Sequence, residues 1–360
     1  MLRPRHTTAI VAVTLAAAVA SGCGGSAAGS SGIVVRPAAA ARHFLASYAT
    51  SDGRVLRRDQ GSDIVSEGQA YGMLLAEIGG REPVARTIWH WTRRHLQRSD
   101  HLLSWHATGD GQVLDPQSAT DADILTAFAL LRYRGPGRAG MHADGRRLAS
   151  AVLAHESVRL TDGTLVPVAG PWATQSEPTV DPSYWSPQIF RWLAHATGDH
   201  RWSQAAAKTR ALVRQVTHDG RQLPPDWARI AGDRLVPTPP PGQSGEPTYG
   251  LDAQRLPVWL ATGCSKREHR LAGHWWRDVL SHHRSDLAAQ TVGTNGTTVN
   301  GNPTPLGYVA SSAAATAAGD AAAGRHLLAQ AVAQASAEPT YYGDAWVALG
   351  GWLLGNGLHC

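Results

Sequence analysis

Apolar residues recur at helical spacing from about residue 38 to the end of the chain. Ile124, Phe128 and Leu131 show the pattern clearly, and β-type alternation is scarce. Glycines interrupt these periodic segments, and a glycine directly after a helix readily adopts the left-handed conformation that ends it. The intervals between successive stops are 56, 63, 65 and 56 residues, for Gly79, Gly135, Gly198, Gly263 and Gly319. Because two helices and their loops fill such an interval, the sequence predicts one all-α domain, a toroid of helical hairpins.

The composition agrees with one large globular domain. Of the 360 residues, 43% are apolar, which excludes a disordered or collagen-like chain. Charged residues make up 17% without a basic or acidic block, so we expect no nucleic-acid partner. Tryptophan is unusually frequent, with 13 residues against 8 tyrosines and 3 phenylalanines. Tryptophan rings stack on sugar rings and also fill cores, and composition leaves both roles open.

Residues 1–22 have the layout of a secretory signal peptide. Arg3 and Arg5 precede an apolar run at residues 9–20, which is too short for a permanent transmembrane helix. The small residues before Cys23 resemble a bacterial lipoprotein processing site, with Ala20 where such sites usually carry Leu. We therefore expect a secreted or cell-surface protein whose membrane contact is a lipid on Cys23. An ordinary signal peptide without lipid is the alternative.

The rest of the chain divides into a short tether and one domain. Residues 23–37 are rich in Gly, Ser and Ala, as a flexible tether would be, and residues 38–360 form the predicted domain. An exported protein permits a disulfide between Cys264 and Cys360, while Cys360 as the last residue is equally compatible with a free thiol. The sequence contains neither CxxC nor HExxH, so we expect no metal and no cofactor.

One carboxylate stands at the start of a predicted helix near residue 66. Ser66 and Gln69 have the spacing of a capping box, and Glu67 lies in the first turn, where the helix dipole favours a negative charge. Glu67 is then either a helix-start acid or a catalytic one. Gly68 and Gly72 each cost the helix about 1 kcal/mol relative to alanine. Their presence indicates that another group closely approaches this backbone.

Two further segments carry acids near helix starts. Thr120 is expected to cap a helix with Asp121 and Asp123 in its first turn. Asp252 and Arg255 are three residues apart, so on a helix they share a face and pair, either structurally or to orient a general base. A toroid of helical hairpins gathers helix ends on one face, where these carboxylates would converge. Glycoside hydrolysis needs a protonated acid and an ionised partner across the scissile bond.

The motifs resemble glycoside hydrolase family 8, and the likeness extends from about Phe44 to Gly355. The segments that carry it are SEGQAYGM at 66–73, SATDAD at 118–123, DPSYWSP at 181–187, LPPDW at 223–227 and YYGD at 341–344. Two positions depart from the family pattern. Asp181 stands in place of an Asn, and Leu251 stands where an aromatic residue often precedes the base, with Tyr249 as the candidate substitute.

The resemblance implies an (α/α)6 barrel, in agreement with the predicted toroid, and an inverting hydrolase without metal or organic cofactor. It implies that Glu67 is the general acid and that Asp252, beside Arg255, is the general base. Asp121 matches an acid that grips the distorted sugar at the cleavage point. Four aromatic residues are candidate sugar platforms: Trp105, Trp185, Tyr341 and Tyr342.

The sequence thus predicts a monomeric endo-β-1,4-glucanase that acts on a cellulose-like polysaccharide. The same chemistry on chitosan or xylan is the nearest alternative. Family chitosanases tend to place the base elsewhere, so Asp252 favours glucan. A non-catalytic glycan-binding lipoprotein would have lost the acid or the base, and both are present. A polysaccharide lyase would need Tyr or His as a base near an acidic sugar, and the dense tryptophans and paired carboxylates argue against it.

Overall fold

A computed structural model describes residues 36–355 and 358, which belong to one compact unit. The expected signal peptide, nearly all of the tether and the lipid site Cys23 lie outside the described residues, so those expectations stay predictions. Cys264 is disulfide-bonded, and Cys360 also lies outside the described part. Within that part, no helix is long and apolar enough to cross a membrane.

Twelve α-helices dominate the described residues. They are α1 (Pro37–Tyr48), α2 (Ser66–Ile78), α3 (Glu82–His95), α4 (Thr120–Arg132), α5 (Arg138–His155), α6 (Pro187–Thr197), α7 (Arg201–Val216), α8 (Arg255–Ala261), α9 (Lys266–Asp278), α10 (Pro305–Ala317), α11 (Ala321–Ala337) and α12 (Tyr341–Gly355).

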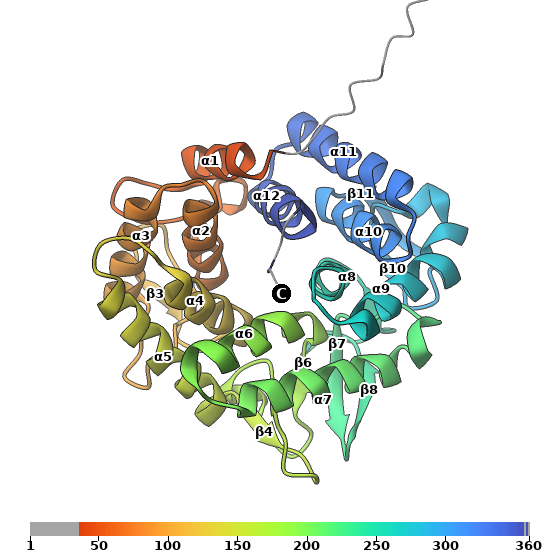
Figure 1. Ribbon diagram of the computed structural model, residues 1–360, viewed down its shortest axis with the longest axis horizontal. Helices are drawn as coiled ribbons and strands as arrows, with labels where there is room; N and C mark the ends of the chain where they lie inside the picture. Colours follow the sequence, from red (N-terminus) through yellow and green to blue (C-terminus); the bar gives the residue numbers. More distant parts are fainter. Residues whose placement is uncertain (1–35, 356–357, 359–360) are drawn as a thin grey trace, which may run out of the picture. The chain divides into compact units, whose positions relative to one another are not determined.

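The even-numbered helices form a closed inner ring. Each of α2, α4, α6, α8 and α10 contacts the next one, and α12 contacts α2 to complete the circle. The odd-numbered helices lie outside this ring, each against the inner helices that precede or follow it (Figure 1). This arrangement is an (α/α)6 barrel, so the predicted toroid of helical hairpins is confirmed.

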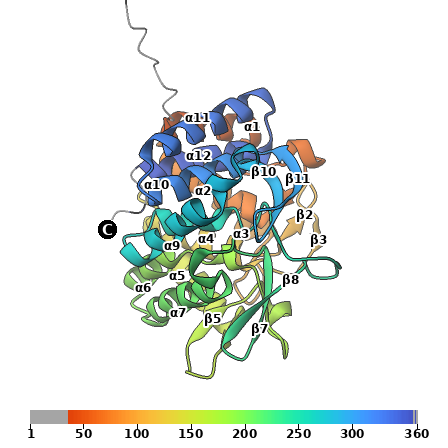
Figure 2. The same ribbon diagram turned by 90° about the vertical axis from the view of Figure 1, so that its right-hand side faces the viewer.

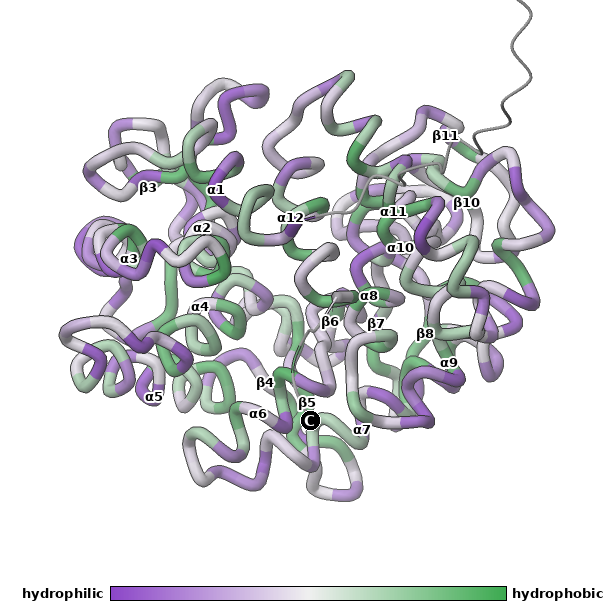
Figure 3. The backbone as a smooth tube through the Cα atoms, turned by 45° about the horizontal axis from the view of Figure 1, so that its top comes forward, coloured by the Kyte–Doolittle hydropathy of each residue, from purple (hydrophilic) through white to green (hydrophobic). Residues whose placement is uncertain are grey.

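The inner helices are apolar on all sides because neighbours cover them on all sides. Every residue of α4 except Arg132 is buried. In Figure 3 the tubes of α4 and α8 are mostly hydrophobic, whereas α3 and α9 carry hydrophilic stretches. Small residues let the inner helices approach closely. A Cβ added to Gly350 of α12 would lie 2.3 Å from Cγ1 of Val309 on α10, a separation that real side chains do not tolerate.

Short strands lie in the connections that lead from an outer helix to the next inner helix, and Figure 2 shows them gathered toward one end of the barrel. They form four small antiparallel sheets, ordered β1-β2-β3, β4-β5, β6-β7-β8 and β11-β10-β9. The sequence did not reveal them, because strands of two to six residues are too short to show alternation. Their bounds are β1 (Ile64–Val65), β2 (His106–Ala107), β3 (Val113–Asp115), β4 (Ser157–Arg159), β5 (Leu165–Pro167), β6 (Thr179–Val180), β7 (Trp227–Ala231), β8 (Arg234–Thr238), β9 (Thr248–Tyr249), β10 (Ala289–Gly293) and β11 (Thr298–Pro303).

The predicted caps of α2 and α4 are wrong. Ser66 is already the first residue of α2, and its buried hydroxyl has no hydrogen-bond partner. The Gln69 side chain reaches away from the helix start instead: it accepts from the backbone N–H of Val55 at 2.6 Å and donates to Thr92 Oγ1 at 2.8 Å. Thr120 likewise begins α4 and makes no cap bond. Tertiary contacts therefore override the local capping pattern at both helix starts.

The close contact between α10 and α12 makes Gly350 a sensitive position. We expect Gly350→Ala to lower the free energy of unfolding by about 1–3 kcal/mol, because the methyl group overpacks against Val309. Gly140→Ala on α5 is the matched control, since nothing lies within 4 Å of its added Cβ. Alanine should stabilise that helix by up to about 1 kcal/mol. Urea unfolding measures both, and equal midpoints for the two variants would contradict the packing argument.

Candidate active site

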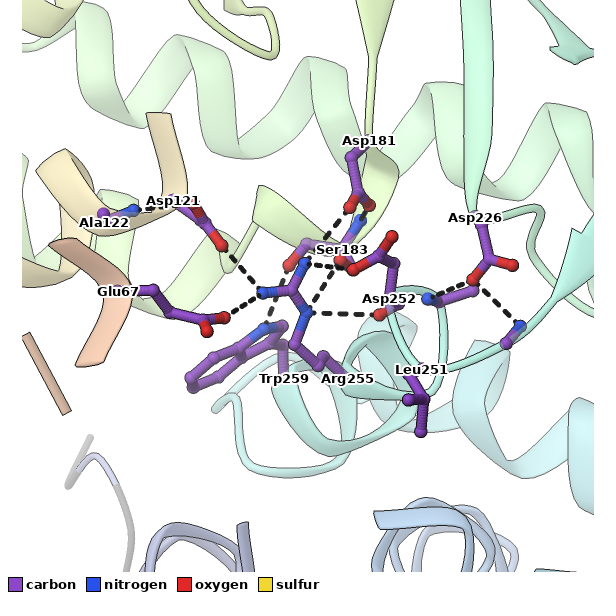
Figure 4. A network of polar contacts seen from close by, with 12 residues as sticks. Glu67, Asp121, Ala122, Asp181, Ser183, Asp226, Leu251, Asp252, Arg255 and Trp259 are labelled. Carbon is purple, nitrogen blue, oxygen red and sulfur yellow. Dashed lines mark hydrogen bonds and ion pairs between the residues drawn. The ribbon is translucent and has the colours of Figure 1, made fainter. Parts of the chain in front are cut away.

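The side chain of Arg255, at the start of α8, is the centre of a buried polar network (Figure 4). Its Nη1 donates to Glu67 Oε1 at 2.9 Å and to Asp121 Oδ2 at 2.7 Å. Its Nη2 donates to Asp181 Oδ2 at 3.1 Å and contacts Asp252 Oδ1 at 3.4 Å. One guanidinium therefore joins four carboxyl groups that the chain supplies from four separate segments.

The network contains more carboxyl groups than cationic groups. One cation cannot neutralise four carboxylates in a buried site, so protons must be retained. Burial, followed by the nearby charge of Asp121, raises the pKa of Glu67 to about 7. Burial also raises the pKa of Asp181 well above its ordinary value and raises that of Asp252, while Arg255 acts against both shifts. Glu67 thus holds a proton near neutral pH.

Glu67 lies in the first turn of α2 and is fixed from two sides. Tyr71, one turn further along the helix, donates its hydroxyl hydrogen to Glu67 Oε1 at 2.7 Å. The Ser66 backbone N–H donates to the carbonyl of Trp105 at 2.9 Å, which brings the loop of Trp105 beside the helix start. The adjacent Gly68 is needed because its Cβ would lie 2.7 Å from the Tyr341 hydroxyl. The close approach that the glycines indicated is confirmed here.

Asp252 lies in a turn before α8, and a second acid holds that turn. Asp226 Oδ1 accepts from the backbone N–H groups of Gly250 and Ala253 at 2.9 and 2.8 Å, and its Oδ2 accepts from Thr248 Oγ1 at 2.8 Å. The side chain of Asp252 is 41% exposed, against 19% for Glu67. The predicted pair of Asp252 and Arg255 is present, and the base candidate is the carboxyl most open to water.

The two acids that open α4 have different surroundings. Asp121 faces Arg255, whereas Asp123 is fully buried and accepts from the backbone N–H of Leu103 at 3.1 Å. Glu156 is buried beside Asp123 and accepts from Ser118 Oγ at 2.7 Å. Burial raises the pKa of Glu156 to about 8 and that of Asp123 well above its usual range. This carboxyl pair supports the start of α4 and is separate from the Arg255 network.

The expected aromatic platforms fall into two groups. Trp105 is half-buried and stacks on His106, with ring centroids 4.7 Å apart, and Tyr342 is half-buried and donates to the carbonyl of Leu251 at 3.3 Å. Trp185 and Tyr341 are each only 1% exposed. The Trp185 indole donates inward to the carbonyl of Pro167 at 2.9 Å. Neither ring exposes a face on which a sugar could stack, so the structure gives no support to Trp185 and Tyr341 as platforms.

A row of aromatic rings that the sequence did not single out runs outward from Arg255. The guanidinium carbon lies 5.2 Å from the centroid of the Tyr184 ring. Tyr184 and Trp227 are 6.4 Å apart between centroids, and Trp227 and Trp172 are 6.5 Å apart. Trp172 is 37% exposed. Tyr184 and Trp227 lay within motifs that carried the resemblance, but Trp172 lay in none.

Comparison with known proteins identifies the family. The sequence model of Glycosyl hydrolases family 8 matches residues 10–350. The chain belongs to this family. It is 30% identical over 228 residues to a probable endoglucanase of Novacetimonas hansenii, across 60% of this chain and 64% of that protein. It is 27% identical over 222 residues to Rex8A of Paenibacillus barcinonensis, a reducing-end xylose-releasing exo-oligoxylanase, across 56% of this chain and 55% of that protein. The matches therefore span less than two thirds of these relatives.

The fold of family 8 is also evident in solved structures. An endo-β-1,4-glucanase of the family from an Achatina fulica gut metagenomic library aligns with a TM-score of 0.72 and 23% identity, covering 88% of this chain and 97% of that one. Sequence identity of this size supports the shared barrel fold alone.

Leu251, which precedes Asp252, is partly buried against the core, and its carbonyl accepts from Tyr342. Figure 4 shows the Leu251 side chain directed away from the guanidinium. Tyr249 does not replace the missing ring, because it is buried in β9. Among residues 36–355, no cluster of His, Cys, Asp or Glu has the arrangement of a metal site. Asp181, which replaces an Asn, accepts from Ser183 N–H at 2.8 Å as well as from Arg255.

The raised pKa of Glu67 makes stability depend on pH. The carboxyl binds its proton more tightly in the folded than in the unfolded chain, so stability is complete below about pH 4.5 and falls as the pH rises to about 7. Glu67→Gln cannot ionise and escapes this loss. We expect the unfolding free energy of Glu67→Gln, relative to the unmodified chain, to increase by on the order of 2–3 kcal/mol between pH 4.5 and pH 8.

Urea unfolding at both pH values measures this difference, and the same comparison in an Asp121→Asn background is the control. Removal of the Asp121 charge lowers the pKa of Glu67, so the pH-dependent gain from Glu67→Gln should shrink. If Glu67→Gln changes the unfolding free energy equally at both pH values in the unmodified background, the surroundings do not raise the pKa of Glu67.

Proposed function

We propose that this chain is an inverting endo-β-1,4-glucanase in which Glu67 is the general acid and Asp252 the general base. One observation supports this assignment above all: Arg255 holds Glu67 on Nη1 and Asp252 on Nη2. Inverting glycosidases separate their two carboxyls by roughly 6.5–9.5 Å to admit a water, against about 5–5.5 Å in retaining enzymes. A guanidinium between the carboxyls keeps them apart and leaves no direct contact through which they could share a proton.

The surroundings of each carboxyl suit its role. Glu67, with a pKa of about 7, arrives protonated and donates to the leaving glycosidic oxygen. Asp252 is the more exposed of the two, and Arg255 favours its ionised form, so it accepts a proton from the attacking water. Asp121 shares Nη1 of Arg255 with Glu67 and is held ready to accept a hydrogen bond from a sugar hydroxyl at the cleavage point.

The substrate is inferred from the aromatic lining and from the relatives. Tyr184, Trp227 and Trp172 form a row along which successive sugar rings of a polymer could stack. The relative from Novacetimonas hansenii is named an endoglucanase, which favours internal cleavage of glucan. The relative Rex8A, named for release of xylose, makes xylan the alternative substrate to test. Leu251 beside the base is the position where this chain's preference could differ.

A reducing-sugar assay on carboxymethylcellulose, xylan and chitosan side by side tests the substrate. We expect the highest turnover on carboxymethylcellulose. In Glu67→Gln this turnover should fall by at least about 10²–10⁴-fold, since general acid catalysis is typically worth that factor. Glu82→Gln, at the start of outer helix α3, is the control and should retain full turnover. Faster cleavage of xylan or chitosan would overturn the glucan assignment, and an active Glu67→Gln would overturn the acid.

The stereochemistry of the product tests the base. NMR of the first product should show the α-anomer from a β-linked chain. Asp252→Asn should be inactive, because the amide cannot take a proton from water, and azide should yield no glycosyl azide of retained configuration. Asp121→Asn should retain more activity than Asp252→Asn. The reverse order would assign the base to Asp121, and a β-anomer as first product would exclude inversion.

A further inference from the structure

A large cavity lies away from the Arg255 network, on the outer wall of the barrel. It has a volume of about 660 Å³ and lies between the outer helices α7 and α9, which are neighbours in Figure 1. We call it the α7–α9 groove. Its lining is mostly cationic and consists of Arg210, Ala211, Arg214, Asp219, Arg267, Arg270, Leu271 and His274.

The arginines of the α7–α9 groove face each other in two pairs. Arg210 and Arg214 are four residues apart on α7, and Arg267 and Arg270 are three apart on α9, so each pair shares one face of its helix. A tight turn fixes one end of the groove. Gly220 has φ +92°, and its Cβ would lie 2.5 Å from Cβ of His274. His274 Nδ1 is 2.9 Å from the carbonyl oxygen of Asp219.

The acids in or near the groove neutralise only part of its positive charge. The pair between Arg214 and Asp219, at 3.5 Å, is more than half exposed on both sides, and such pairs contribute little. Buried Glu268 lies 3.7 Å from Arg210 but already accepts two bonds of 2.7 Å from Arg191. Within the part of the chain that the structure describes, Arg267 and Arg270 form no ion pair.

Folding gives no reason for this concentration of positive charge. Arg267 and Arg270 lie at the start of α9, where the helix dipole disfavours cations. The cavity between α3 and α5 is a useful contrast within the same molecule. There Arg93 and Arg147 both pair with buried Asp144, so the arginines serve the fold. In the α7–α9 groove, buried Glu268 pairs with Arg210 at 3.7 Å but is bonded more closely to Arg191, and within the described residues Arg267 and Arg270 have no acidic partner.

We propose that the α7–α9 groove binds a segment of an anionic glycan whose repeating units carry carboxylate or phosphate groups. A guanidinium binds either group through two parallel hydrogen bonds, and arginines on both walls would contact successive groups of one chain. The lining contains no Trp, Tyr or Phe. It therefore lacks the large aromatic platforms on which neutral sugar rings stack. The site would attach the protein to an acidic polymer while the barrel's Arg255 network remains free.

Affinity electrophoresis of the full chain in gels that contain a defined polymer tests this proposal. We expect retardation by polygalacturonate, which carries carboxylates, or by a phosphomannan, which carries phosphates, and none by neutral dextran. The stronger of the two identifies the anionic group. Raised salt should weaken the retardation, because exposed charges are screened. Duplex DNA that binds as tightly as the better polymer would overturn the assignment to a glycan, and absence of retardation by both polyanions would overturn the site.

Two double variants that lose the same charge locate the binding. Arg267→Gln with Arg270→Gln removes two groove arginines. This double variant should raise the dissociation constant by about tenfold or more, as expected for the loss of two charge-assisted contacts. Arg146→Gln with Arg325→Gln removes two exposed arginines from α5 and α11 and should change it by less than about twofold. Equal weakening by both would mean that only net charge matters. Unchanged melting temperatures show that both variants fold.

Discussion

The contact of one arginine with four carboxyl groups determines how this site is built. Arg255 is buried, and a buried cation is tolerated only with close counter-charges. Four carboxyl groups surround it, those of Glu67, Asp121, Asp181 and Asp252, and the ones that stay ionised supply the counter-charge. They lie in segments up to 188 residues from Arg255 in the sequence. Each of these segments immediately precedes or begins an inner helix. The closed inner ring therefore has a direct chemical result: it brings helix starts from distant parts of the chain to one guanidinium.

Much of this site could be predicted, and the limits have physical causes. Local motifs and the family resemblance singled out Glu67, Asp121, Asp252 and Arg255, and the structure places all four in one network. Local patterns failed where a side chain has a distant partner. Gln69 has the spacing of a capping residue, yet it bonds to Val55 and Thr92, which no local pattern can reveal.

Exposure was the second limit on prediction. Trp185 and Trp172 are the same residue type, and both lie in connections that lead into an inner helix, yet Trp185 is buried and Trp172 is exposed. The difference comes from tertiary contacts that sequence spacing does not encode. The Trp185 indole donates to the carbonyl of Pro167 in β5, whereas Trp172 lies in η2 (Pro171–Ala173) and is partly open to solvent. Arginine shows the same dependence on context. Arg255 is surrounded by acids. Of the four groove arginines on α7 and α9, Arg214 has only an exposed pair with Asp219, and Arg210 has a 3.7 Å contact with Glu268, which is held by Arg191.

The turn that carries Asp252 is held by another ionisable group, and this affects how kinetic data would be interpreted. Asp226 accepts three hydrogen bonds as a carboxylate, and burial raises its pKa to about 6. Protonation turns one of its oxygens from an acceptor into a donor, which disrupts the bonds to Thr248, Gly250 or Ala253. A fall in rate on the acidic side of the pH profile would then report displacement of this turn as readily as protonation of Asp252 itself. Kinetic assignment of the residue that activates water would therefore require a variant in which Asp226 can no longer titrate.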